Sequence, residues 1–521
     1  MKQIVVFFFL FLSTSVDAQS YDIEWSELET AHGRLVYLMP DSSDQFYALR
    51  WSGGRVLGRY QISRHEKLQQ VDRGKVSITV KGSVGTFEGA RIIGGKLITF
   101  LSDRRGEERI FVMQEYSDNL EPQEEKQLAS YEVDKFVDRG WFDIITSSNK
   151  KYFAVVWQIP GKKDDKDRYG FKIFNTKLEL INEGDYRVPF PSELSVIQNH
   201  HVSDKGEYFL SVTEYQPSEK RGLFRNNNEF KAVHIFHIAE DGLQDFTLNF
   251  DGQRIEAMAV TPSGEDELTI TGLYGPTDSP GVTGVFYQRV NLTDGSVVIE
   301  GFKEFSQDFI TQDWSEREIE RAERREDRGR GEPQLYNYMM REAIVNSDGS
   351  IVGTMEQYYV QVSSSSAGQT GQMSNVYNYY YNDIIAYKID PDGEFEWVNK
   401  VNKYQVSTND GGPYSSYESF VDQGKIYFIF NDNSSNYNEE GDFLDPERIS
   451  AATYSKKRNV VALASIDLAT GDQERRSFFD RSEIEALVVP KLFEVDYKTG
   501  EMLIYATWGR KEKIGLLKFR N

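Results

Sequence analysis

Residues 488–519 read VVPKLFEVDYKTGEMLIYATWGRKEKIGLLKF. This stretch contains three short apolar runs, 488–495, 501–508 and 514–519, and the segments between them have the composition of turns. The pattern predicts three β-strands where a four-stranded unit needs one more. Residues 21–28 precede the first complete unit and have no strand partner near them in the sequence. We therefore expect them to form the outer strand of this last unit and to close a ring.

A turn followed by an apolar run recurs along the rest of the chain, and with residues 45–51 near the start this mark occurs eight times. Internal repeats of about 40 to 50 residues are typical of β-propellers, in which four-stranded blades bury their faces only against their neighbours, and insertions between or within blades lengthen the spacing. We predict an all-β fold, with one β-propeller domain over residues 19–521 and eight blades. Seven blades is the alternative, because the first unit is the least regular. The expected blade limits are 33–74, 84–136, 141–190, 195–250, 254–308, 335–402, 416–480 and 486–519, the last completed by 21–28.

The first residues have the features of an export signal. Lys2 is followed by an apolar run from Ile4 to Leu12, and Val16-Asp17-Ala18 fits a cleavage site of small residues. We expect residues 1–18 to be removed as a signal peptide. The mature protein would then lie in the periplasm, at the outer membrane or outside the cell.

Composition excludes several classes of function. The chain has no cysteine, so a disulfide framework and thiolate chemistry are excluded. Its net charge of -22 argues against binding to nucleic acid. Beyond the signal, no stretch approaches the roughly 20 apolar residues that a membrane-spanning helix needs. Aromatic residues make up 13% of the chain, which favours strands over helices.

Two insertions interrupt the repeat. Residues 311–333 are dense in charges of both signs, and Glu320 and Arg324 have helical i,i+4 spacing, so a solvated helix is expected between Trp314 and Arg330. Residues 363–375 are rich in Ser, Gly and Gln and are expected to form a flexible hairpin tip between two tyrosine-rich strands. Exposed tyrosine suits protein interfaces. The predicted partner contacts are Tyr377, Tyr379, Tyr380 and Trp314.

Polar residues on the expected innermost strands form a candidate ligand site in a central funnel. Two carboxylates at a suitable separation there could hydrolyse a glycosidic bond, and a water-filled polar channel is the alternative. The chain has none of the common hydrolase, zinc-protease, phosphate-loop or dinucleotide-binding motifs, which lowers the expectation of an enzyme without excluding one. The funnel candidates are His201, Arg254, Glu256, Arg341 and Glu418.

An oxygen-rich loop suggests calcium as the one candidate cofactor. Asp432, Asn433, Asp442 and Asp445 offer the carboxylate and amide oxygens that a hard cation prefers. The loop lacks the spacing of a helix-loop-helix calcium site, and a solvated polar loop is the alternative.

The C-terminal third carries a family resemblance. The run 379–385, the segment from Asp392-Gly393 to Glu396-Trp397, residues 405–412 and the motif YFIFNDN at 427–433 resemble a family of exported propeller-like proteins of Bacteroidota. The resemblance is clearest over residues 335–519. It implies a location in the envelope of a Gram-negative cell, and the family brings no assigned activity or catalytic residues.

These observations favour an exported scaffold or binding propeller without catalytic activity, serving as a subunit of, or accessory to, a protein complex of the cell envelope. A glycan-binding or carbohydrate-active propeller that uses the funnel is the first alternative. A structural propeller stabilised by calcium is the second.

Overall fold

The computed structural model describes residues 21–519 except 22, 43, 54–57, 134–139, 163, 218–227, 240–241, 251, 264–265, 278–280, 313, 315, 327–332, 347, 368–371, 446–447 and 455–456. The expected signal peptide, residues 1–18, lies outside the described residues. Within them, no helix is long and apolar enough to cross a membrane.

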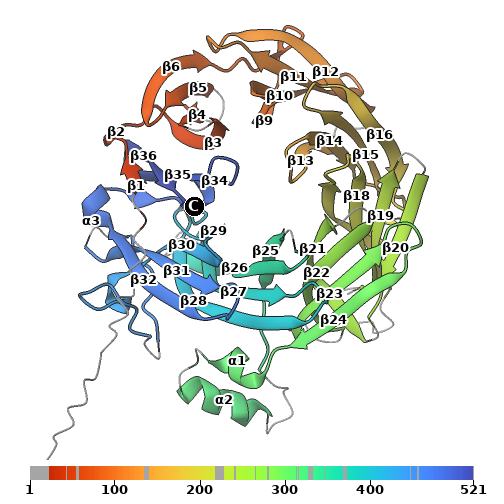
Figure 1. The fold of residues 1–521 in the computed structure, drawn as a ribbon. Coiled ribbons are helices and arrows are strands. Elements are labelled where there is room, and N and C mark those ends of the chain that lie inside the picture. The colour runs from red at the N-terminus through yellow and green to blue at the C-terminus, as the bar shows by residue number, and fades with distance from the viewer. Residues whose placement is uncertain are drawn as a thin grey trace, which may run out of the picture.

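The described strands form a ring of eight antiparallel sheets, the blades of a β-propeller (Figure 1). The predicted fold and the count of eight blades are therefore confirmed. Blades 1 to 4 consist of β3 (Arg34–Ser42), β4 (Gln45–Ser52), β5 (Arg59–Glu66) and β6 (Gln69–Lys75); β9 (Thr86–Ile93), β10 (Lys96–Arg105), β11 (Glu108–Tyr116) and β12 (Pro122–Glu132); β13 (Trp141–Thr146), β14 (Tyr152–Ile159), β15 (Arg168–Asn175) and β16 (Leu180–Arg187); and β17 (Ser195–Val202), β18 (Tyr208–Gln216), β19 (Glu229–Ala239) and β20 (Gly242–Leu248).

The first strand of each blade faces the centre of the ring, as β9, β13, β21, β25 and β29 show in Figure 1. Blades 5 to 7 consist of β21 (Gln253–Ser263), β22 (Glu267–Pro276), β23 (Gly284–Asn291) and β24 (Val297–Glu304); β25 (Tyr338–Val345), β26 (Ile351–Ala367), β27 (Gln372–Ile389) and β28 (Phe395–Thr408); and β29 (Glu418–Asp422), β30 (Lys425–Asn433), β31 (Asn459–Asp467) and β32 (Gln473–Asp480). Short elements in the connections are β7 (Thr79–Val80), β8 (Ser83–Val84), α3 (Arg481–Ile484) and the 3-10 turns Ser192–Leu194, Ser434–Asn436 and Pro490–Leu492.

Blade 8 is built from both ends of the chain. Its strands are β33 (Leu487–Val488), β34 (Glu494–Asp496), β35 (Glu501–Trp508), β36 (Lys511–Lys518), β1 (Ile23–Trp25) and β2 (Glu29–Thr30). β1 pairs antiparallel with β36, with Ile23 opposite Leu517 and Trp25 opposite Gly515. The N-terminal strand is thus the outer strand of the last blade, as the sequence predicted.

The hydrophobic core is divided among the gaps between blades. Each pair of neighbouring blades shares its own cluster of buried side chains, and the two terminal blades share one as well. In that last cluster, Leu38 and Phe46 of blade 1 pack against Leu503 and Leu516 of blade 8. Because blades bury their faces only against neighbours, closure of the ring buries the faces that the two terminal blades would otherwise expose.

The charged insertion is helical, as predicted. Helix α1 (Gln307–Thr311) precedes α2 (Glu316–Glu326), and both lie outside the ring in Figure 1. Arg324 and Glu320 form the expected i,i+4 ion pair, with Nη2 and Oε2 3.1 Å apart. Residues 327–332 of this insertion lie outside the described residues.

The second insertion differs from the expectation. Strands β26 and β27 do not stop at residues 362 and 376 but continue to pair until Ala367 stands opposite Gln372. The serine-rich segment from 363 to 367 is therefore strand rather than loop. Antiparallel pairing supplies its backbone hydrogen bonds, so its low strand propensity does not end the strand. Residues 368–371 lie outside the described residues.

Candidate functional site

Blade 6 carries a hairpin that is longer than the blade itself. β25 pairs with β26 only as far as Gln357, and β28 does not reach the outer residues of β27. Beyond Gln357, β26 pairs only with β27, whereas β28 still pairs with β27 as far as Asn378, opposite Thr408. We call this projection, residues 358–364 and 375–381, the hairpin arm.

One face of the hairpin arm is apolar and open. Val360 lies opposite Tyr379 and Val362 opposite Tyr377, so these four side chains share a face. Val362 is 52% exposed, Tyr377 40% and Val360 37%. The predicted partner residues Tyr377 and Tyr379 therefore lie on an accessible surface.

Aromatic pairs cross the hairpin arm on both faces. The rings of Tyr359 and Tyr380 stack with centroids 4.5 Å apart and planes at 11°. The rings of Tyr358 and Tyr381 lie 4.6 Å apart near the base of the arm. Cross-strand aromatic pairs of this kind stabilise a two-stranded ribbon.

The hairpin arm is also free of charge. From Gln357 to Asn382 the sequence has no charged residue, although 27% of the whole chain is charged. Its described residues are rich in Tyr, Ser, Asn, Gln and Val, a composition close to that of antibody binding loops. Tyrosine offers a large contact area at low entropic cost, and small polar residues offer adaptable hydrogen bonds.

A buried ion pair lies under the hairpin arm. Lys403 Nζ is 2.9 Å from Glu356 Oε1, and both side chains are fully buried. Lys403 also donates to the carbonyl of Tyr381 at 2.9 Å and to Gln405 Oε1 at 3.2 Å, while Ser416 Oγ donates to Glu356 Oε2 at 2.7 Å. Burial lowers the pKa of Lys403, and the Glu356 charge opposes that shift. The pair is hydrogen-bonded well enough to hold the base of the arm in one position.

This network continues into blades 7 and 8. Gln405 donates to the carbonyl of Asn431 on β30 at 2.8 Å. Lys491, in the connection before β34, donates to the Tyr381 hydroxyl at 2.8 Å and to the carbonyl of Gly412 at 2.7 Å. The arm therefore rises from a base that is tied to three blades.

Three glutamates from successive innermost strands lie within electrostatic reach of one another. They are Glu342 on β25, Glu418 on β29 and Glu494 on β34. Burial raises the pKa of Glu418 well above its usual range, the charges of Glu342 and Glu494 raise it further, and Arg341 opposes them. Burial also raises the pKa of Glu342, against the Ser419 hydrogen bond of 2.9 Å and the charge of Arg341. The channel thus holds carboxyl groups that take up protons readily.

Glu494 has an accessible side chain, although protein atoms surround its carboxyl group on most sides. This desolvation raises its pKa to about 7, against the charges of Arg91 and Lys150. A glutamate with the usual pKa near 4.5 is ionised at neutral pH. Glu494, with a pKa of about 7, is partly protonated there.

The structure divides the predicted funnel residues into three places. Arg341 and Glu418 are brought together, as described above. Arg254 and Glu256 pair with each other on blade 5, with Nη2 and Oε2 2.9 Å apart. His201 on blade 4 lies beside the ring of Phe209, and burial lowers its pKa to about 4. The five residues therefore do not form one site.

The oxygen-rich loop is held together by its own residues. Asp432 forms a buried ion pair with Arg475, and its carboxylate also accepts hydrogen bonds from Tyr437 at 2.7 Å and Asn436 at 3.0 Å. The Arg475 guanidinium lies 4.0 Å from the ring centroid of Phe443. These contacts occupy the carboxylate that a cation would need.

The other predicted calcium ligands are spread along the same loop. Asn433 caps the turn by accepting from the amide of Ser435 at 3.0 Å, and Asp442 accepts from Asn438 at 3.2 Å. Asp445 has a positive φ of 44°. Among the residues that the structure describes, no group of three or more His, Asp and Glu side chains could hold a metal ion.

Trp314 is placed differently from the three tyrosines. It is half-buried and packs against the core shared by blades 5 and 6, which includes Phe305 and Ile310. Lys400 donates to the carbonyl of Phe309 at 2.9 Å and fixes α1 to blade 6. In this position Trp314 anchors the helical insertion.

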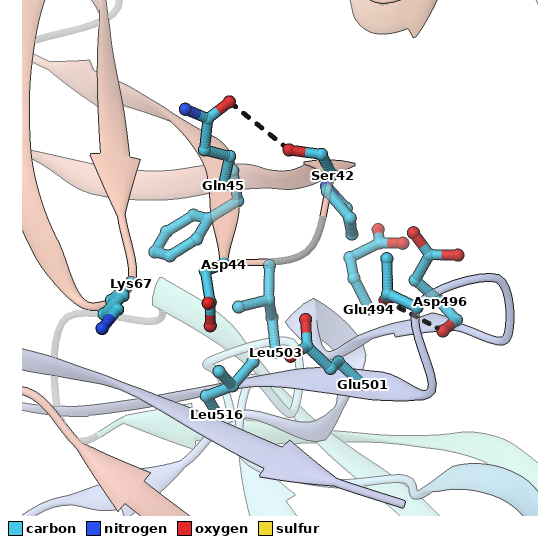
Figure 2. Close-up of a pocket in the computed structure, with 12 residues that line it drawn as sticks. Ser42, Asp44, Gln45, Lys67, Glu494, Asp496, Glu501, Leu503 and Leu516 are labelled. Atoms are coloured by element: carbon cyan, nitrogen blue, oxygen red, sulfur yellow. Dashed lines mark hydrogen bonds between the residues drawn. The ribbon is translucent and has the colours of Figure 1, made fainter.

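The described residues also form hollows away from the hairpin arm. A cavity of about 10 Å³ lies at the seam of blades 1 and 8, lined by Asp44, Glu494, Asp496 and Glu501 (Figure 2). Its volume is about that of one water molecule. A shallow groove of about 430 Å³ runs along β20 toward the turn at Asp294.

The comparisons with known proteins concern the fold. No family model matches the chain, and a search of curated proteins found no match. Among solved structures, the β-propeller domain of the trilobed protease from Pyrococcus furiosus is 10% identical, covers 86% of this chain and 98% of its own, and has a TM-score of 0.34. The Chaetomium thermophilum protein Sqt1 is 9% identical over 95% of this chain and 98% of its own, with a TM-score of 0.37. Prolyl oligopeptidase B from Galerina marginata is 10% identical over 86% of this chain and 56% of its own, with a TM-score of 0.32. At these identities and TM-scores, the names of these proteins transfer no activity or partner to this chain.

Sequence reasoning missed the network under the hairpin arm. A partial signal exists, since Glu356 ends the largely apolar run Ile351–Met355, but Lys403 lies in a strand that already carries Glu396 and Lys400. The partners Gln405 and Ser416 carry no such signal. Only the packing of blade 6 on blade 7 identifies them.

Proposed function

We propose that the protein is an exported binding propeller of the cell envelope that docks on a partner protein through the hairpin arm. The observation that carries this proposal is the open, uncharged face of Val360, Val362, Tyr377 and Tyr379. The base of the hairpin arm is rigid because the hydrogen-bond network of Glu356 ties it to neighbouring blades. A preorganised aromatic surface of this kind loses little entropy on binding. The signal peptide expected over residues 1–18 and the family resemblance support the envelope location.

The test places charge on this face. The tagged full chain is purified from envelopes of the cells that produce it, and the co-purified proteins are measured by quantitative mass spectrometry. A partner at constant stoichiometry with the wild type is expected to be lost with the double variant Val360→Lys/Val362→Lys. The matched control is Leu180→Lys/Ile181→Lys on β16, where each side chain is 46% exposed. Loss in both variants, or in neither, would contradict docking by the arm.

A second candidate function is glycan binding in the channel, and the Glu342, Glu418 and Glu494 group favours it. A protonated carboxyl can donate a hydrogen bond to a sugar hydroxyl, which a carboxylate cannot. Glycan arrays and a hydrolysis screen test this candidate with Glu418→Gln and Glu418→Ala. Binding that survives the first change and not the second supports it, and the absence of any hit from the wild type rejects it.

A further inference from the structure

The hairpin arm presents an open strand edge. The amide of Tyr358 donates to the carbonyl of Asn337 at 2.9 Å, on the β25 side of β26. Because backbone groups alternate in direction along a strand, the N–H and C=O groups of Val360, Val362 and Ser364 point to this same side. β25 does not extend this far, so among the described residues no strand covers this edge of the arm. All three residues are exposed.

This edge differs from the outer edges of the other blades. Natural proteins protect exposed strand edges with charges, proline or bulges, because an unprotected edge recruits other strands. Each outer strand outside blade 6 carries at least one acidic residue, namely Asp72, Glu125, Asp185, Asp245, Glu300, Glu474 and Glu24. The arm has no charge and no proline over residues 358–364. An arm edge without charge or proline, where the outer strands of the other blades all carry an acidic residue, indicates that it is covered when the protein functions.

We propose that the β26 edge of the hairpin arm accepts an extended, uncharged segment of a partner protein as an added β-strand. The inference rests on the proposed docking function and specifies how the partner is bound. Main-chain hydrogen bonds to Val360, Val362 and Ser364 provide the affinity, and the alternating side chains of the partner pack beside Val360 and Val362. A second copy of this chain is disfavoured as the occupant, because two chains with a net charge of -22 repel each other.

The experiment is site-specific photo-crosslinking of the full chain in the cells that produce it. A photoreactive residue replaces Gln361, which is exposed and lies between the two outward-facing valines. Crosslinked peptides are mapped by mass spectrometry. We expect them to come from an extended segment of another protein without charged residues.

Two variants distinguish binding through the backbone groups of the strand edge from binding through the side chains of the arm. Val362→Pro removes one outward N–H and no hydrogen bond within the hairpin, whereas Val362→Ala keeps the N–H and shortens the side chain. Loss of one main-chain hydrogen bond is expected to lower the crosslink yield roughly fivefold for Val362→Pro, with little change for Val362→Ala. Unchanged melting temperature and circular dichroism show that the arm is intact. If Val362→Pro disturbs it, Val360→Pro provides the same test.

Three results would overturn the inference. Crosslinks to residues 359–364 of this chain itself identify a second copy as the occupant. Equal crosslinking by the wild type and by a correctly folded proline variant would show that the partner docks through side chains alone. In that case the strand-addition inference fails, and the proposed docking function still holds if Val360→Lys/Val362→Lys loses the partner. No crosslink from the wild type, together with no effect of the double lysine variant, rejects both the edge and the docking function.

Discussion

The hydroxyl of Tyr21 donates a hydrogen bond of 2.6 Å to the carboxylate of Asp422, although 401 residues separate them in the chain. The Tyr21 ring also meets Phe420 edge-to-face, with centroids 5.7 Å apart. Phe519, near the other end of the chain, stacks on Phe420 at 5.0 Å. Both ends of the chain are therefore fastened to blade 7 next to the strand pair that closes blade 8.

Removal of this fastening should weaken the whole ring. Tyr21→Ala deletes a ring that is only 5% exposed, and we expect it to lower the free energy of unfolding by about 3–5 kcal/mol. Tyr21→Phe keeps the ring contacts and loses the hydrogen bond to a charged group, which costs about 1.5–3 kcal/mol. Denaturant unfolding measures both values. A Tyr21→Ala protein as stable as the wild type would show that the N-terminal strand does not close the ring in solution.

A buried ion pair holds blade 8 on its other side, at the seam with blade 1. Arg50 on blade 1 lies 2.8 Å from Glu512 on blade 8, and the Tyr505 hydroxyl donates to the same carboxylate at 2.9 Å. Glu512→Leu leaves a buried guanidinium unpaired, and we expect a loss of about 3–5 kcal/mol. Arg50→Met/Glu512→Leu should recover part of that loss. The control is Glu320→Gln, which removes the exposed ion pair with Arg324 and should change the free energy of unfolding by about 0.5 kcal/mol or less.

The network under the hairpin arm should control its rigidity. Lys403→Met leaves the buried Glu356 carboxylate without its cation, so we expect a loss of about 3–5 kcal/mol and faster amide exchange in the arm. Lys403→Met/Glu356→Leu removes both charges and should restore much of the protection of the arm amides against hydrogen exchange. Hydrogen exchange of the arm compared with that of blade 3 is the measurement. Uniform changes in both regions would show that the pair stabilises the ring without holding the arm.

His65 should make stability fall in acid. Its side chain is 2% exposed and stacks on Phe46, and burial together with the Arg50 charge lowers its pKa to about 4. His65 takes up a proton near pH 6.5 in the unfolded chain and only near pH 4 in the folded chain. The folded state is therefore at its full stability above pH 6.5 and loses stability as the pH falls from 6.5 to 4. The loss amounts to about 3 kcal/mol. His65→Phe should flatten this part of the curve of stability against pH, and an NMR titration of His65 near 6.5 would contradict the prediction.

Glu494 should act in the opposite direction. Its pKa is raised to about 7 in the folded protein, so the folded state binds the proton more tightly than the unfolded state. Stability from this group therefore decreases as the pH rises from 4.5 through 7. Glu494→Gln should match the wild type at pH 4 and be the more stable protein at pH 8. Equal pH dependence of the two proteins would show that this carboxyl titrates normally.

The architecture was predictable because its signals are local. Each blade is marked in the sequence by a turn followed by an apolar run, and a few adjacent residues are enough to recognise both. The missing fourth strand after residue 488 and the unpaired segment 21–28 were sufficient to infer how the ring closes, as the pairing of β1 with β36 confirms. The tyrosines of the hairpin arm were identified for the same reason, since their abundance is visible without any partner.

The channel and the buried networks depend on tertiary structure. Alternation along a strand predicts which side chains face the channel, but the register shifts at Glu256 and Arg341, where the innermost strands bulge, and a bulge changes the direction of the side chains. The pairing of Glu356 with Lys403 and Ser416 joins residues of different strands and blades. The sequence by itself determined the blades and the closure of the ring, because hydrophobic periodicity and turn chemistry act over short distances. Only the packing of one blade on the next decided which charges are buried together and which strand edge stays open.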